Sequence, residues 1–93
     1  MFVIKPYPIK LDGLNKYREI TIETVMGALF VGIRNDKLIA LLDPDAQTET
    51  RTFYAVTENE KMDVSIDNVR YLGVIQGKND MFFIVEDLGS FGI

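Results

Sequence analysis

The chain has 93 residues, a net charge of −4, and neither cysteine nor histidine. A chain of this length forms one domain, and its acidic balance argues against binding a nucleic-acid polymer, which requires a dense basic surface. Without cysteine and histidine, the protein has no disulfide, no thiol nucleophile, no cysteine-ligated zinc and no histidine-based catalytic site.

The N-terminal part of the chain predicts two strands. Phe2–Lys5 is typical of a short opening strand, and Pro6 and Pro8, which cannot donate hydrogen bonds to a sheet, either end it or place it at a sheet edge. Tyr17–Ile22 alternates polar and apolar residues with the period of a half-buried strand. Thr24–Gly27 predicts a break before the next strand.

A hairpin follows, and it is the clearest local prediction. Ala28–Arg34 and Lys37–Leu42 are apolar, β-favouring runs that only Asn35 and Asp36 separate. Asn and Asp tolerate positive φ better than most residues, and the tight turn of a hairpin requires positive φ. We therefore expect these two runs to pair as neighbouring antiparallel strands.

The remainder of the chain predicts three further strands and one irregular segment. Asp43–Gln47 is expected to be a loop, because its proline biases the preceding residue away from helix. Thr57–Asp67 is polar and charged, and Val64–Asn68 has the composition of a single helical turn. The strands are predicted at Thr50–Val56, Val69–Gln76 and Met81–Val85, with a turn at Gly77–Asp80.

These elements indicate the fold class. No segment keeps a 3.6-residue period over more than two turns, whereas short strands and turn signals follow one another along the chain. The pattern predicts an all-β fold, a small antiparallel sandwich or partly open barrel of about six to seven strands with at most one short helical turn. We expect residues 1–93 to form one domain, with residues 88–93 as a mobile tail.

The sequence also bears on location. No apolar run approaches the roughly 20 residues of a membrane helix. The first residues lack the basic-then-apolar order of a signal peptide. We therefore expect a cytoplasmic protein that does not insert into a membrane.

The acidic loop holds the first candidate site. Asp43, Asp45 and Glu49 suggest either ligands for a divalent cation or the carboxylates of a hydrolase. A calcium loop needs more ligands at fixed spacing and usually a glycine at its sharp turn, and this loop has neither. We favour a loop without metal or catalytic residues, in which Asp43 forms an Asx-turn. The residues expected to fix this structural corner are Asp43, Pro44 and Glu49.

Arg51 is the second candidate, because alternation along its strand places it on the same face as Phe53 and Ala55. Such an arginine either binds a ligand phosphate or carboxylate bidentately or pairs internally with Asp43 or Glu49, since a buried unpaired charge is costly. We favour the internal pair. If a ligand binds, the residues expected to contact it are Arg51, Arg18, Tyr54 and Phe53.

Two adjacent phenylalanines indicate a surface that needs a cover. Phe82 and Phe83 lie in one predicted strand, so their rings point to opposite faces. One ring faces away from the main core, and a second sheet, the C-terminal tail or another subunit would cover it. This is the strongest indication in the sequence of a homo-oligomer.

Four segments together resemble a family of small domains from bacteriophages and bacteria. They are IKPYPI at 4–9, LIALLDP at 38–44, ETRTFYAV at 49–56 and YLGVIQ at 71–76. Members of that family show an opening like YKYPL, followed in the same order by ALVDP, ETRTFxV and YLGTVQ. The resemblance implies an all-β fold and a phage setting, and it brings no established activity.

The chain departs from the family pattern at two places. After Val56 the family has a segment with glycine and histidine, where this chain has Thr57–Glu60. The last strand of the family carries tryptophan and histidine, and Met81–Val85 carries neither. A site built on that histidine is therefore not expected in this protein.

These observations lead to a functional expectation. We expect a non-enzymatic binding protein without a cofactor, which antagonises a host process such as antiviral defence in the host cytoplasm. Two mechanisms fit, namely sequestering a small nucleotide signal through an arginine and an aromatic ring, or docking on a host protein through a sheet edge or an acidic face. The alternative is a structural or assembly module that acts through homo-oligomerisation.

Overall fold

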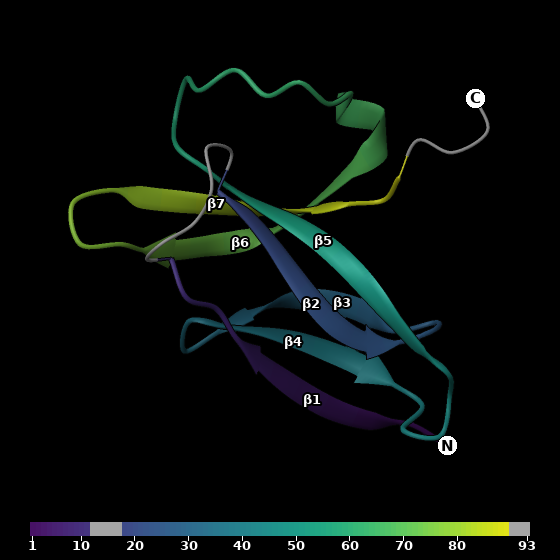
Figure 1. The fold of residues 1–93 in the computed structure, drawn as a ribbon. Coiled ribbons are helices and arrows are strands. Elements are labelled where there is room, and N and C mark those ends of the chain that lie inside the picture. Colours follow the sequence, from purple (N-terminus) through teal and green to yellow (C-terminus); the bar gives the residue numbers. More distant parts are fainter. Residues whose placement is uncertain (12–17, 90–93) are drawn as a thin grey trace.

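The computed structural model describes residues 1–11 and 18–89 and confirms the predicted all-β class. Seven antiparallel strands form two sheets, with strand orders β1-β4-β3 and β2-β5-β7-β6 (Figure 1). The described strands do not close into a barrel. The strands are β1 (Val3–Pro8), β2 (Glu19–Val25), β3 (Leu29–Arg34), β4 (Lys37–Leu42), β5 (Thr48–Val56), β6 (Val69–Gln76) and β7 (Met81–Asp87), and a 3-10 helix, η1 (Ile66–Asn68), precedes β6.

The predicted hairpin is present as β3 and β4. Arg34 pairs with Lys37, and the two turn residues between them have positive φ, 51° at Asn35 and 61° at Asp36. The turn therefore has the backbone that these residue types favour. The hairpin gives the smaller sheet its two consecutive strands, and β1 pairs with the other edge of β4.

Two N-terminal strands are longer than the sequence indicates, because pairing extends them. β1 runs through Pro6 and Pro8 and lies at a sheet edge, where a residue without an N–H is tolerated. The break predicted at Thr24–Gly27 is wrong at its start, since Thr24 and Val25 pair with the first residues of β5. The turn itself begins at Met26.

The core lies between the two sheets. The rings of Phe30 in β3 and Phe53 in β5 are fully buried and meet edge to face, with centroids 4.8 Å apart. Such a pair contributes roughly 0.5–1.5 kcal/mol beyond the burial of its area. The other fully buried apolar side chains are Leu38, Ala40, Ala55 and Ile84.

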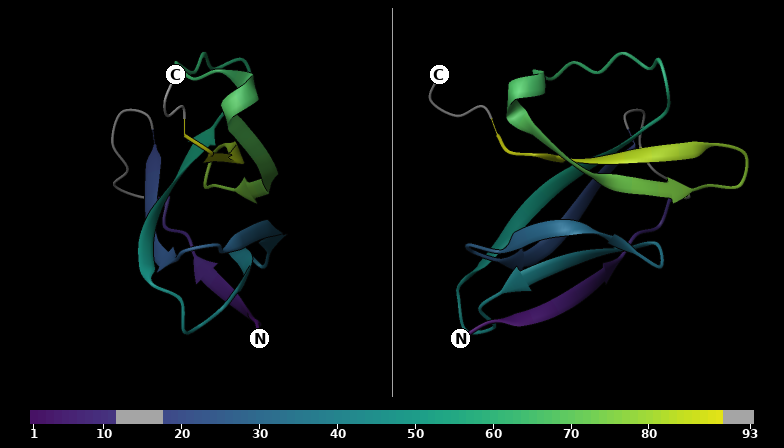
Figure 2. Two further views of the ribbon diagram at one scale, coloured as in Figure 1. Left: turned by 90° about the vertical axis from the view of Figure 1, so that its right-hand side faces the viewer. Right: turned by 180° about the vertical axis from the view of Figure 1, so that it is seen from behind.

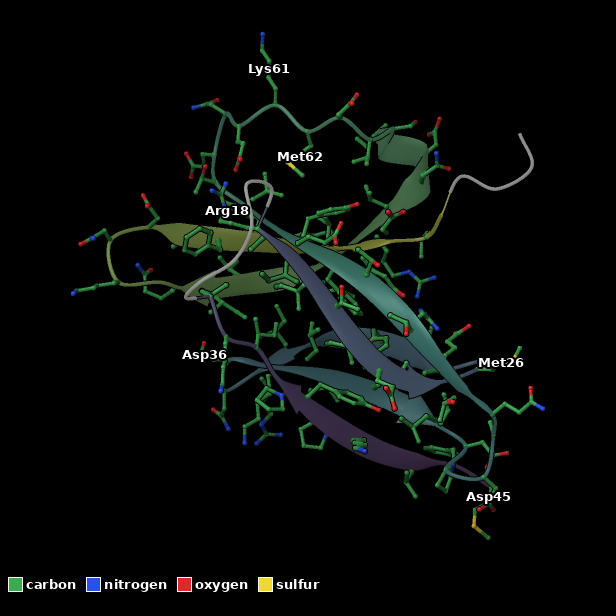
Figure 3. All side chains as sticks on the ribbon, in the orientation of Figure 1. Arg18, Met26, Asp36, Asp45, Lys61 and Met62 are labelled. Carbon is green, nitrogen blue, oxygen red and sulfur yellow. The ribbon has the colours of Figure 1, made fainter. Side chains whose placement is uncertain are left out.

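Part of the outer face of the larger sheet is covered by the loop between β5 and η1. Phe82 packs against the core and Phe83 lies on the opposite face, as predicted. Phe83 shares an apolar groove with Met62 and Val64 of this loop. Figure 3 shows Met62 pointing back toward the sheet and Lys61 pointing away from it. This loop therefore covers part of Phe83, which was not among the covers expected from the sequence. Cover by another subunit stays a prediction, and residues 90–93 of the tail lie outside the described part of the chain.

Candidate functional site

A groove lies beside the paired ends of β5 and β7, on the right-hand side of Figure 1. Its volume is about 370 Å³. We call it the acidic groove, and its lining residues are Glu49, Thr50, Arg51, Thr52, Glu86, Asp87, Leu88 and Gly89. Antiparallel pairing of Thr52 with Asp87 and of Phe53 with Glu86 fixes the two walls relative to each other.

Arg51 links the two strands of the groove through its guanidinium. Its Nε donates to Glu86 Oε2 at 2.7 Å, and its Nη2 lies 2.5 Å from the same oxygen. Its Nη1 donates to Glu49 Oε2 at 3.0 Å. The favoured internal pair with Glu49 is thus confirmed, whereas Glu86 is a partner that the sequence analysis did not anticipate.

Glu86 is the most unusual residue of the groove, because its side chain is charged and fully buried. One of its oxygens, Oε2, accepts from Arg51. The other, Oε1, is buried and has no hydrogen-bond partner among the described residues. Leaving a buried acceptor unsatisfied costs about 1–3 kcal/mol, and more for a charged group. Next to the groove, the buried Glu86 carboxylate therefore keeps one acceptor without a donor among the described residues.

Burial and neighbouring carboxylates shift the pKa values of two side chains in and beside the groove, Arg51 and Tyr54. Burial lowers the pKa of Arg51, but hydrogen bonds and charge from Glu86, and then from Glu49, outweigh burial and hold that pKa above its ordinary value. Burial, together with the hydrogen bond to Asp87 Oδ2, raises the pKa of Tyr54. One guanidinium pairs with two carboxylates, those of Glu49 and Glu86, so negative charge is in excess.

Asp87 has a structural part in the same groove. Its Oδ2 accepts from the Tyr54 hydroxyl at 3.1 Å, and its Oδ1 accepts from the Gly89 backbone N–H at 2.8 Å. The Leu88 N–H donates to the Asn68 carbonyl at 2.8 Å. The first two residues of the predicted mobile tail are thus hydrogen-bonded, and residues 90–93 lie outside the described part of the chain.

Arg18 lies elsewhere, next to the far end of β5. Its Nε donates to the Ala55 carbonyl at 2.9 Å, its guanidinium forms an ion pair with Glu60, and it lies over the ring of Phe82. The backbone hydrogen bond from Thr57 lowers the pKa of Glu60, burial opposes this, and Arg18 adds to it. Arg18 therefore anchors the loop after β5 to the sheet.

The loop after β4 behaves as a structural corner. Asp43 Oδ1 accepts from the Asp45 backbone N–H at 2.9 Å, which is the predicted Asx-turn. Ala46 also donates to the Asp43 carbonyl at 3.1 Å. Within residues 1–11 and 18–89, no group of three or more acidic side chains is arranged to hold a metal ion.

The four residues predicted to contact a ligand do not share this groove. Arg51 lines it, Phe53 belongs to the core, Tyr54 lies on the outer face, and Arg18 pairs with Glu60. Glu86 was missed because an acidic residue after an apolar run normally signals the end of a strand. Its one signal was the period of two from Phe82 and Ile84, which continues the core-facing side through residue 86.

Comparison with known proteins assigns no family to this arrangement. No helix in the described part of the chain has the length and apolar character to cross a membrane. The chain matches no family model, no curated protein and no solved structure.

Proposed function

We propose that the protein is a non-enzymatic, phage-type binding protein that antagonises a host process, such as antiviral defence, by docking on a host protein. The acidic groove receives a basic side chain of that partner. The observation that carries the proposal is the excess of negative charge in the groove, where Arg51 alone pairs with both Glu49 and Glu86.

The chemistry of the groove favours a cationic donor. A guanidinium or ammonium group that enters the groove pairs with Glu49, whose side chain is 34% exposed, and offsets the excess negative charge. Hydrogen bonds between charged groups contribute about 1.5–3 kcal/mol. A groove of about 370 Å³ accommodates one long basic side chain. A single anchor in a pocket is how many protein interfaces obtain their affinity.

The same geometry weighs against holding a nucleotide in this groove. Each of the three guanidinium nitrogens of Arg51 already faces Glu49 or Glu86. A phosphate would have to displace a carboxylate and would leave the Glu86 charge buried without a partner, which is expensive. Two nitrogens of the Arg18 guanidinium, Nε and Nη2, likewise already contact the Ala55 carbonyl and Glu60. Docking is therefore the mechanism we propose.

The groove also favours binding over proton transfer. Both oxygens of Asp87 and one oxygen of Glu86 already accept hydrogen bonds. The chain has no histidine or cysteine to act beside them. These carboxylates are positioned to hold a donor group in place.

A phage-plating assay tests the proposal. Expressed in a panel of bacteria that carry different antiviral defences, the protein is expected to restore phage plating on at least one strain. Glu49→Gln, which removes a partly exposed negative charge of the groove, is expected to lose this effect. Asp45→Asn is the matched control, because it removes one exposed carboxylate from the loop after β4, outside the groove.

Calorimetry separates docking from nucleotide sequestration. ADP-ribose and cyclic nucleotides are expected to give no heat with the wild-type protein. A nucleotide that binds the wild type and fails to bind Arg51→Ala would replace docking by sequestration. Equal restoration of plating by Glu49→Gln and wild type would remove the groove from the proposal.

A further inference from the structure

The smaller sheet has an apolar outer face. Ile4 is 64% exposed, Val31 53% and Leu29 45%, which is high for large apolar side chains in strands. Figure 2 (right) shows β1, β4 and β3 on the side of the molecule away from β2 and β5, with no described segment over them. We call this surface the outer apolar face, and it consists of Ile4, Pro6, Leu29, Val31, Ile39 and Leu41.

Strand register makes the face continuous. Leu41 of β4 pairs with Ile4 on one side and with Leu29 on the other, and Ile39 pairs with Pro6. Directly opposite residues in a sheet point to the same face, with Cβ atoms about 4.5–5.5 Å apart. The paired side chains therefore form one patch, and they are not separate exposed residues of the kind that every surface has. Val31 lies in the same strand as Leu29, at a register shift between Phe30 and Gly32, and is exposed as well.

The central strand has a sequence suited to burial on both sides. Leu38, Ala40 and Leu42 face the core, and the alternate positions Ile39 and Leu41 are also apolar. An antiparallel strand with one solvated face normally alternates apolar and polar residues, whereas an uninterrupted apolar run is typical of a strand covered on both faces. The composition of β4 thus calls for a permanent cover on its outer side.

The charge of the face suits a second copy of the chain. None of the six residues of the outer apolar face carries a charge, although the chain as a whole has a net charge of −4. Two acidic molecules can therefore meet on this face without burying like charges against each other. An identical copy is also present whenever the protein is, as a permanent cover requires.

The sheet edges favour stacking of faces over lateral pairing. Pro6 and Pro8 remove two N–H groups from β1, one edge of the smaller sheet, which discourages addition of a strand there. At the other edge, Ile33 of β3 packs on Gly73 of β6, because a Cβ built at Gly73 would lie 3.3 Å from Ile33 Cδ1. A second copy is therefore expected to pack face to face, at the roughly 10 Å spacing of stacked sheets.

The size of the face fits the centre of a dimer interface. Its exposed side chains present on the order of 400 Å² of apolar surface, in the range of the largest patch on a typical monomer, which is often functional. A standard interface buries roughly 800 Å² per partner, of which about 65% is apolar in homodimers. The patch supplies most of that apolar part.

We infer that the protein is a homodimer in which the outer apolar faces of two copies stack on each other. The acidic groove lies on the other sheet and remains open in this dimer, so that one dimer presents two grooves. The inference rests on the smaller sheet alone and does not depend on what the groove binds.

Sedimentation equilibrium tests the dimer. The wild-type protein is expected to have twice the chain mass of 10.6 kDa at micromolar concentration. Ile4→Glu and Val31→Glu place a charge in the interface and are expected to weaken association at least a hundredfold. Ile66→Glu is the matched control, because Ile66 is an equally apolar residue, 85% exposed, outside this face. It is expected to leave the mass unchanged.

A second measurement uses only the wild-type protein. Broadening of methyl resonances by an inert soluble gadolinium complex is expected to be weaker at Val31 than at Met81 of the other sheet. The two side chains are about equally exposed in one copy, 53% and 48%, and the dimer shields only Val31. A monomeric wild-type mass would overturn the inference. So would equal broadening at the two methyl groups, or a dimer that Ile4→Glu and Val31→Glu leave intact.

Discussion

Replacing Arg51 by methionine tests how much the ion pair between Arg51 and the buried Glu86 contributes to stability. The Arg51 side chain is 21% exposed and shields Glu86, whose side chain is fully buried. Removing one partner of a buried ion pair leaves the other charge uncompensated and costs about 3–5 kcal/mol. We expect about 3 kcal/mol, at the lower end, because Arg51 retains some solvent contact. The free energy of unfolding of a small domain is about 5–15 kcal/mol, so this loss is large.

Two companion variants separate charge from packing. Glu49→Gln alters the exposed partner of Arg51, whose side chain is 34% exposed, and is expected to cost at most about 1 kcal/mol. The double variant Arg51→Met with Glu86→Leu removes both charges and is expected to recover more than half of the loss. Urea denaturation followed by circular dichroism gives each free energy of unfolding, with m-values compared to confirm the same transition. A cost below about 1 kcal/mol for Arg51→Met, or no recovery in the double variant, would show that pairing with Arg51 does not compensate the buried charge of Glu86.

Two further predictions concern a turn and a titrating side chain. Gly77→Ala is expected to lower the free energy of unfolding by about 1–3 kcal/mol in urea denaturation, because its Cβ would lie 2.5 Å from the Phe82 ring. Gly32→Ala is the control and should cost less, since its Cβ would meet nothing closer than 3.9 Å. Equal costs for the two variants would contradict this prediction. The pKa of Glu60 lies below its ordinary value of 4.5, so its stabilisation is fully present above pH 4.5 and is lost as the pH falls through the folded value. Glu60→Gln should therefore lower stability at neutral pH and flatten the acid dependence, and an unchanged acid profile would count against the Thr57 and Arg18 contacts.

Much of the fold could be predicted from local patterns in the sequence. The turn at Asn35 and Asp36 was predictable because these residue types favour positive φ, and β6 has the predicted bounds. Alternation along β5 placed Arg51 on the face of Phe53, which is correct. These features depend on residues close in sequence, so that one chain is enough to indicate them.

The features that the sequence did not indicate depend on partners distant in sequence. Glu86 follows an apolar run and looks like the exposed end of a strand, yet pairing with β5 and β6 extends β7 through it. Its burial is tolerable only because Arg51, 35 residues earlier, lies opposite it. The same holds for the cover of Phe83, which comes from a polar loop whose path no local pattern shows.

The central claim is that the acidic groove binds a cationic side chain. Its most direct test is a titration of isotope-labelled protein, followed by amide chemical shifts, with capped Gly-Arg-Gly and with its citrulline analogue, which has the same shape and no charge. We expect the arginine peptide to shift the amides of Arg51, Leu88 and Gly89 and the citrulline peptide to leave them unchanged. Equal shifts with both peptides, or shifts with ADP-ribose alone, would contradict it.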